Sequence, residues 1–287
     1  MKRHVWRRYK SSAAALVKNG GEDRIAAPDD ATWPGPLVTD GDGIRKFTGA
    51  KGGAGVWQRI ISQMPPHDLY VEAFAGTGQV LRRKLPAEAC IAIDGDAAVA
   101  EVLKATLPAG VIVVCGDAIS WLEKHRRDFT PRTVVYCDPP YLGSVRHDAQ
   151  RDYYRLEFQT EEQHAALLAV LLRVAGQGVP VLLSGYRSTL YDERLKGWRR
   201  LDYRTATHGR TVTESLWCSF PEPTALHDYR FLGDGFRERE RIKRKLARWR
   251  TRLAAMPILE RQLIAAAIAE SGEHRCSPAT AMRAQKL

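Results

Sequence analysis

The chain has 287 residues and a formal net charge of +11 at pH 7. This length suits one large α/β domain with appendages, because single hydrophobic cores stop growing near roughly 250–300 residues. The positive charge favours a polyanionic partner. No apolar run is long enough to span a bilayer, and the five cysteines have no paired short spacing. We therefore expect a soluble, cytoplasmic protein with no membrane partner, no disulfide and no bound metal.

Secondary-structure signals begin after residue 43. Residues 1–43 mix charge, proline and glycine without a regular period, which predicts a flexible basic leader. A helix is expected over residues 56–64, because its apolar residues have helical spacing and stop at two prolines. Strands are then expected at 69–71, 90–93, 111–115, 133–137 and 179–183, separated by helices ending at Leu85 and spanning 97–106, 119–125 and 161–175.

The alternation of strands and helices predicts the fold class. Each expected strand is a near-continuous apolar run, which indicates a parallel sheet covered on both faces. A β-like pair over 198–205 and 211–220 predicts an antiparallel hairpin that closes the sheet. Beyond Pro223, apolar residues three or four apart predict a helical hairpin. One face of its first helix carries an arginine stripe: Arg237, Arg241, Arg244, Arg248 and Arg252.

A glycine-rich turn follows the first expected strand. Gly76 and Gly78 lack Cβ atoms, so a nucleotide-like ligand could approach the backbone closely there. Asp94 ends the next strand, where an acidic side chain commonly binds the hydroxyls of a ribose. A dinucleotide dehydrogenase is the competing interpretation, but its fingerprint needs a small residue where Leu81 stands. The pattern therefore disfavours hydride transfer. A glycine turn that only packs a helix on a strand is the simpler alternative.

The tetrad Asp138-Pro139-Pro140-Tyr141 follows the fourth expected strand. An exocyclic aromatic amine is a poor nucleophile, because its lone pair is delocalised into the ring. The Asp138 carboxylate and the Pro139 carbonyl could accept the two amine hydrogens while Tyr141 stacks on a flipped base. This predicts direct methyl transfer to a planar amine. Cys137 raises the alternative of thiol catalysis, but its side chain should point opposite to Asp138 and pack in the core.

These ordered motifs resemble the D12-class DNA adenine N6 methyltransferases, in particular the compact forms of phages and prophages. The resemblance covers roughly residues 47–220, although Ala50 and Thr77 stand where the family commonly has glycine. It implies a Rossmann-like class I methyltransferase sheet, S-adenosylmethionine as cofactor, and duplex DNA with a flipped base as partner. The implied cofactor-binding residues are Lys51, Glu72, Phe74, Ala75, Gly76, Thr77, Gly78, Asp94, Asp117 and Ala118, and the implied catalytic residues are Asp138, Pro139, Pro140 and Tyr141.

The residues that recognise the DNA sequence must lie elsewhere in this chain than in the larger family members. Those members insert a target-recognition domain before the tetrad, whereas residues 78–138 are consumed here by expected strands and helices. Basic side chains interleaved with aromatic ones suit contact with phosphates and bases. They occur in the loop 143–158 and at the hairpin tip 204–210, and the candidates are Arg146, Arg151, Tyr153, Tyr154, Arg204, His208 and Arg210. Solvated basic loops are the alternative interpretation.

The predicted organisation has three parts: a leader over residues 1–43, a methyltransferase domain over 44–223 and a basic helical extension over 224–287. The arginine stripe is either a clamp on a nucleic-acid backbone or a solvated face. Cytosine N4, an RNA adenine and a protein glutamine amide stay open as acceptors, and so does a DNA-binding module without catalysis. Asp138 favours adenine, because protein-amide enzymes usually have Asn there and N4-cytosine enzymes often have Ser. The recognition sequence, a partner endonuclease and the oligomeric state stay open.

Overall fold

The computed structural model describes residues 55–142, 160–207 and 210–273. The predicted leader and the predicted DNA-contacting loop 143–158 therefore lie outside the described residues. Described residues up to Phe231 form one compact unit, and those from Leu232 onward form a second.

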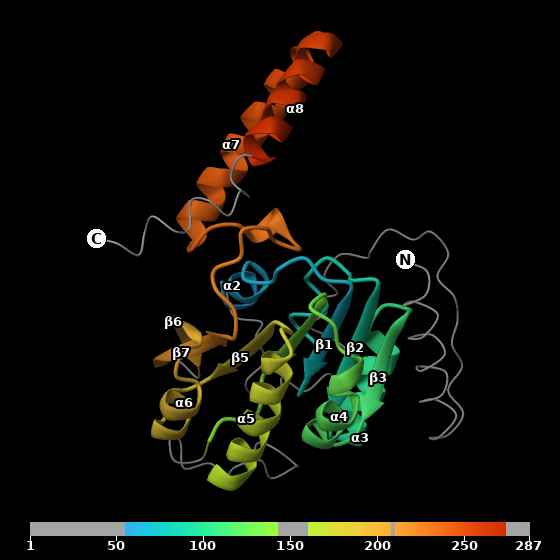
Figure 1. Cartoon of the computed structure of the whole chain (residues 1–287), viewed down its shortest axis with the longest axis vertical. Helices are drawn as coiled ribbons and strands as arrows, with labels where there is room; N and C mark the ends of the chain where they lie inside the picture. Colours follow the sequence, from blue (N-terminus) through green and yellow to red (C-terminus); the bar gives the residue numbers. More distant parts are fainter. Residues whose placement is uncertain (1–54, 143–159, 208–209, 274–287) are drawn as a thin grey trace. The chain divides into compact units, whose positions relative to one another are not determined.

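The first unit is built on a seven-stranded sheet in the described part of the chain, with the strand order β3-β2-β1-β4-β5-β7-β6 (Figure 1). Strands β1 to β5 run parallel, whereas β7 is antiparallel to both β5 and β6. The predicted α/β sheet and its closing hairpin are therefore confirmed. The strands are β1 Leu69–Ala73, β2 Ala89–Asp94, β3 Val111–Cys115, β4 Thr133–Cys137, β5 Val181–Gly185, β6 Arg199–Thr207 and β7 Arg210–Cys218.

Helices cover both faces of the sheet, because side chains alternate between the faces along each strand. Val71 and Val135 pack in one core cluster with α4 and α5, whereas Tyr70 and Tyr136 pack in the other with α2 and α3. The helices of this unit are α2 Val56–Ile61, α3 Ala97–Thr106, α4 Ala118–His125, α5 Glu161–Gly176 and α6 Thr189–Arg194, with short 3₁₀ helices at Arg126–Asp128 and Tyr229–Phe231.

Side-chain caps explain where four of these helices begin. A polar side chain before each helix accepts a backbone N–H of the first turn, which would otherwise lack a partner. The capping residues are Asp96 for α3, Asp117 for α4, Thr160 for α5 and Ser188 for α6. Helix α6 was missing from the sequence prediction, because its six residues are too few to show a period.

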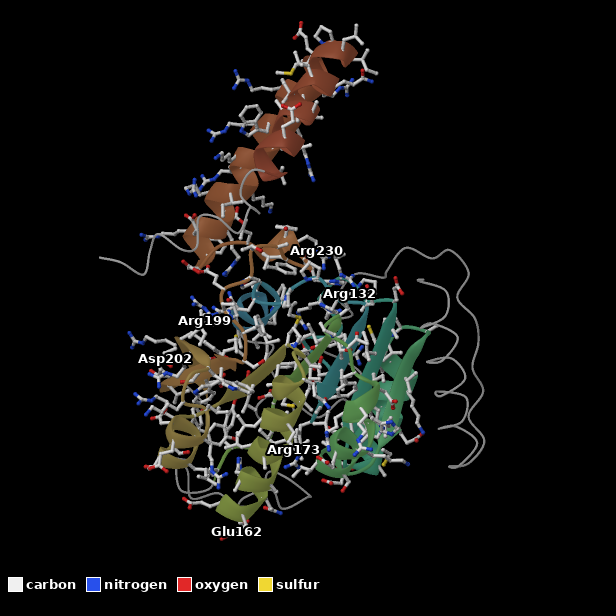
Figure 2. All side chains as sticks on the ribbon, in the orientation of Figure 1. Arg132, Glu162, Arg173, Arg199, Asp202 and Arg230 are labelled. Carbon is white, nitrogen blue, oxygen red and sulfur yellow. The ribbon has the colours of Figure 1, made fainter. Side chains whose placement is uncertain are left out.

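The helix expected between Gly78 and Leu85 is wrong, because the structure has consecutive turns there. Lys84 turns inward instead of continuing a helical face. Its side chain is 2% exposed, its Nζ lies 4.4 Å from the Tyr70 ring centroid, and it donates a hydrogen bond to the Leu85 carbonyl at 2.7 Å. The Leu85 N–H donates to Asp228 Oδ2 at 3.1 Å. Arg230, labelled in Figure 2, pairs with the same carboxylate at 2.7 Å. The distant segment around Asp228 thus fixes the path of these turns.

The second unit contains the two predicted helices, α7 Phe236–Ala255 and α8 Ile258–Glu273, separated by Pro257. No residue of α7 is buried. The predicted apolar face is only partly covered: Ile242 and Leu253 are half-buried, whereas Leu246 and Trp249 are exposed. Within the described residues, no helix is long and apolar enough to cross a membrane.

Candidate active site

Three strand ends meet at the carboxyl edge of the sheet and bring the predicted motifs together. Ala73, the last residue of β1, is in register with Ile93 of β2 and with Cys137 of β4. The Asp138 N–H donates to the Ala73 carbonyl at 3.3 Å, and the Gly76 N–H donates to Asp94 Oδ2 at 2.8 Å. The glycine turn, Asp94 and the tetrad therefore share one edge, where ligands bind in sheets of this kind.

The two glycines of the turn have different roles. Both have left-handed backbones, with φ of 52° at Gly76 and 63° at Gly78. A Cβ at Gly76 would meet no atom within 4 Å, whereas one at Gly78 would lie 3.3 Å from Leu103 Cδ2. Gly76 thus leaves its backbone open to a ligand, and Gly78 lets the turn pack on α3. Phe74 also has a positive φ, 58°, which costs an L-residue roughly 1–2 kcal/mol and is concentrated at ligand-binding turns.

Polar groups beside the turn suit a nucleoside-like ligand. Asp94 is half-buried, and its Oδ1 accepts the Asp96 N–H at 3.0 Å. Burial raises the pKa of Asp94 despite these hydrogen bonds. A carboxylate has about four lone-pair sites, so Asp94 retains capacity to accept hydroxyl groups. The buried Thr77 Oγ1 has no hydrogen-bond partner among the residues that the structure describes. The predicted binding residue Ala75 is buried in the core.

The sequence interpretation had implied that Glu72 lies in the turn. In the structure it lies inside β1. Its carboxyl is 3% exposed and accepts the Tyr70 hydroxyl at 2.9 Å. The pKa of Glu72 is raised to about 8, because burial and the nearby Asp138 carboxylate outweigh the opposing effects of the Tyr70 hydrogen bond and of Lys84. Glu72 is therefore a buried residue of the core next to the site, where it is held by its hydrogen bond with Tyr70.

The predicted adenine-flanking pair begins α4. Asp117 is exposed, and its Oδ2 accepts the Ser120 N–H at 2.7 Å as a helix cap. Ala118 is 3% exposed and packs in the core. Both positions have structural roles in this arrangement, and their contact with a cofactor stays a prediction.

The tetrad leads from the end of β4 into a cluster of aromatic rings. Asp138 is half-exposed, Pro139 is buried and Pro140 is half-exposed. The Tyr141 ring centroid lies 4.3 Å from that of Tyr186. Its hydroxyl donates to Glu214 Oε1 at 3.1 Å. Burial raises the pKa of Tyr141, and the neighbouring Asp138 and Glu214 carboxylates raise it further. Tyr141 is therefore a neutral hydrogen-bond donor held in a fixed place.

Sequence comparison finds a family similar to the part of the chain that contains this tetrad. Residues 113–207, about a third of the chain, match the family of D12 class N6 adenine-specific DNA methyltransferases. This segment is therefore similar to D12 methyltransferases. Enzymes of the D12 family use S-adenosylmethionine as methyl donor. No curated protein matches the sequence.

Solved structures similar to this chain include a SAM-dependent methyltransferase from Agrobacterium tumefaciens, with 16% identity, a TM-score of 0.37, and coverage of 56% of this chain and 58% of that one. TrmN from Thermus thermophilus has 18% identity, a TM-score of 0.38, and coverage of 56% and 46%. Precorrin 8w decarboxylase from Methanobacterium thermoautotrophicum has 14% identity, a TM-score of 0.37, and coverage of 56% and 86%. The chain thus spans about half the length of the first two. With TM-scores this low, the similarities assign neither substrate nor partner.

Cys137 directly precedes the tetrad Asp138-Pro139-Pro140-Tyr141, but it does not suit nucleophilic catalysis. Its side chain is fully buried, and burial raises the pKa of its thiol further above the usual range. The thiolate that attacks in cysteine catalysis is therefore disfavoured. Among the described residues, no group of three or more metal-binding side chains is arranged to hold an ion.

Glu214 is the site residue that the sequence interpretation missed. Its carboxylate is 6% exposed and accepts two hydroxyls, from Tyr141 and, at 3.2 Å, from Tyr203. Glu214 is the single acid of β7, and this was the available signal. The sequence could not give the register that pairs Glu214 with Tyr203 and Ser215 with Gly185, one residue before Tyr186.

Most residues predicted to contact DNA are not described. Arg146, Arg151, Tyr153, Tyr154 and His208 lie outside the described residues, as does the side chain of Arg210. The predicted cofactor-binding residue Lys51 also lies outside them. Arg204 is exposed on β6. The structure therefore describes the glycine turn and the tetrad of the candidate site, and the DNA contacts stay predictions.

Proposed function

We propose that this chain transfers the methyl group of S-adenosylmethionine to the N6 amine of adenine in DNA, with the target base flipped out of the duplex. The observation that carries the proposal is the position of Asp138-Pro139-Pro140-Tyr141. It lies within the D12-matching segment and shares a sheet edge with the glycine turn. The proposed catalytic domain spans residues 44–223.

The residues at the turn fit the cofactor. The open space above Gly76 leaves room for it, Asp94 supplies acceptors for ribose hydroxyls, and Thr77 Oγ1 supplies a buried polar atom in need of a partner. When bound, S-adenosylmethionine supplies an electrophilic methyl carbon on a sulfonium. The residues of this chain orient the two reactants and exclude water from them.

Asp138 and Pro139 prepare the acceptor nitrogen. The Asp138 carboxylate and the Pro139 carbonyl accept the two N6 hydrogens and draw the nitrogen toward tetrahedral geometry. An amine held in this way by Asp138 and Pro139 would direct its lone pair at the methyl carbon that S-adenosylmethionine would supply. The surplus amine proton leaves through the Asp138 carboxylate toward solvent. Two successive prolines keep the accepting carbonyl in place.

Tyr141 holds the flipped base. Its ring is fixed by two contacts, the Tyr186 ring and the Glu214 carboxylate. A fixed aromatic ring stacks on a base at little cost in side-chain entropy. Stacking compensates in part for the interactions that the base loses when it leaves the duplex.

Expression of the full chain in a methylation-deficient host tests the proposal. The host DNA is sequenced by a method that reports modified bases, and Asp138→Ala serves as the matched control. We expect N6-methyladenine at a defined sequence with the wild-type chain and none with the variant. Detection of N4-methylcytosine, methylated RNA or a methylated glutamine amide would in each case identify a different methyl acceptor. Cofactor binding without transfer to any substrate would instead favour a DNA-binding module.

A further inference from the structure

The positive charge of the chain is concentrated on helix α7. Residues 236–255 contain nine basic and two acidic side chains, so this helix carries +7 of the net +11 charge. It belongs to the second compact unit and not to the unit that contains the proposed active site. The polyanionic partner that the charge of the whole chain indicates should therefore bind largely to α7.

The arginine stripe forms one continuous face of α7. Its members lie three, four or seven residues apart, which places them on one side of an α-helix. All five are exposed, and many nitrogen-tipped side chains project outward along the helix (Figure 2). The stripe extends over about 22 Å at the rise of an α-helix. Duplex DNA presents about 13 phosphate charges over that length of its axis.

The arrangement differs from that of an ordinary solvated helix. Exposed helices usually place opposite charges three or four residues apart. Here the only acids of α7 are Glu238 and Glu240 in its first turns, which pair with Arg241 at 2.6 Å and with Lys243 at 3.8 Å. Farther along, Arg244, Arg248 and Arg252 follow one another at four-residue spacing and repel. A bound polyanion would remove this repulsion.

The residue types favour phosphate over other polyanionic surfaces. Seven of the nine basic residues are arginine, whose planar fork matches phosphate oxygens in pairs. The Arg252 guanidinium lies 5.4 Å from the ring centroid of Trp249, which is 43% exposed and offers a stacking surface beside the stripe. We propose that the arginine stripe of α7 binds the phosphate backbone of duplex DNA without regard to sequence. It thereby raises the concentration of substrate near the linked catalytic unit.

The identity of the polyanion as DNA rests on the proposed function. Sequence-independent binding to the backbone predicts a specific division of roles. Removing the stripe should weaken DNA binding equally for all sequences and raise KM, and it should leave kcat unchanged at saturating substrate.

The salt dependence of binding tests the inference in the full-length chain. The stripe variant replaces its five arginines by glutamine, which retains helix propensity. The matched control also loses five positive charges, but from exposed residues of the catalytic unit: Lys104, Lys124, Arg127, Arg194 and Lys196, each changed to glutamine. Binding of a labelled random-sequence duplex is measured without cofactor over a range of KCl concentrations, and circular dichroism checks helix content.

We expect the slope of log K against log salt concentration to fall by up to about 4.5 in the stripe variant, because each lost phosphate contact removes about 0.9. The control should keep a slope close to that of the wild type. Equal slopes in the stripe variant and the control would overturn the inference. So would an unchanged DNA slope combined with lost binding to phosphatidylserine-containing vesicles, which would assign the stripe to a membrane surface. Because no methyl transfer is measured, failure of the proposed function leaves this result interpretable.

Discussion

The carboxyl edge of the sheet and helix α7 contrast in both charge and burial. Among the described residues, the edge gathers four carboxyl groups, those of Glu72, Asp94, Asp138 and Glu214, and two of these residues are no more than 6% exposed. Helix α7 carries nine basic residues and no buried one. An acidic edge can accept protons from an amine, but it repels phosphates. A basic exposed helix attracts phosphates but has no means to activate an amine.

This contrast indicates that chemistry and polyanion binding are separable in this protein. A change at the edge should alter the methyl-transfer step, and a change on α7 should alter binding and its salt dependence. Each variant below tests one part of the edge, in order of decreasing expected effect. An effect of an edge variant on the salt slope would break the separation.

Asp138→Ala should have the largest effect. Removal of the proton-accepting carboxylate should lower the rate of methyl transfer by about 10²–10⁴-fold, the usual contribution of such a group. Cofactor binding should stay close to wild type, because Gly76 and Asp94 remain. Single-turnover transfer of a labelled methyl group and calorimetric cofactor titration check the two parts. Substantial residual transfer would show that Asp138 has another role.

Tyr141→Ala should have the next largest effect. Loss of stacking on the flipped base, worth roughly 1–3 kcal/mol, should lower kcat/KM by about five- to a hundredfold. Tyr141→Phe keeps the ring and serves as the matched control, so it should lose only the roughly fivefold contribution of the hydroxyl contact, whereas Tyr141→Ala loses that contribution and the stacking as well. If both variants lose the same activity, the hydroxyl and not the ring carries the function of Tyr141.

Glu214→Gln should have a smaller effect that acts through Tyr141. The amide retains only one acceptor oxygen for two tyrosine hydroxyls. Weakening one charge-assisted hydrogen bond by about 1 kcal/mol should raise KM for DNA about fivefold and change kcat little. Tyr141→Phe should raise KM similarly, and the double variant should add nothing further. Additive losses would mean that Glu214 acts independently of Tyr141.

The sequence predicted the strands that form the edge better than it predicted the residues that pack beside the edge. The five parallel strands are apolar runs bounded by turns, and for such runs local pattern and tertiary position agree. Gly76, Asp94 and Asp138 could be placed at this edge from the sequence because each lies at the carboxyl end of a strand or within three residues of it. Glu214 and the turns before Leu85 were not found, because they depend on strand register and on Asp228, more than 140 residues away in the chain. Local periodicity contains no information on such distant contacts.

The smallest expected effect on methyl transfer comes from Glu72, for which we predict a change in the pH dependence of stability. Its pKa is raised to about 8 in the folded protein, from an ordinary value of 4.5. Between these pH values the folded protein keeps a proton that the unfolded chain releases, so stability should fall as pH rises from 4.5 to 8. Burial lowers the pKa of Lys84 to about 8 from 10.5, so its contribution should make stability rise with pH above 8. The two groups together predict a minimum of stability near pH 8.

Glu72→Gln keeps an acceptor for the Tyr70 hydroxyl but removes the ionisable group, so it should abolish the decline between pH 4.5 and 8. Urea unfolding at several pH values measures the effect. Glu101→Gln is the control, because this acid of α3 is 73% exposed and should leave the curve unchanged. An identical decline in Glu72→Gln would mean that Glu72 is already ionised in the folded protein. The edge would then carry one more negative charge at neutral pH, which would make its contrast with α7 larger.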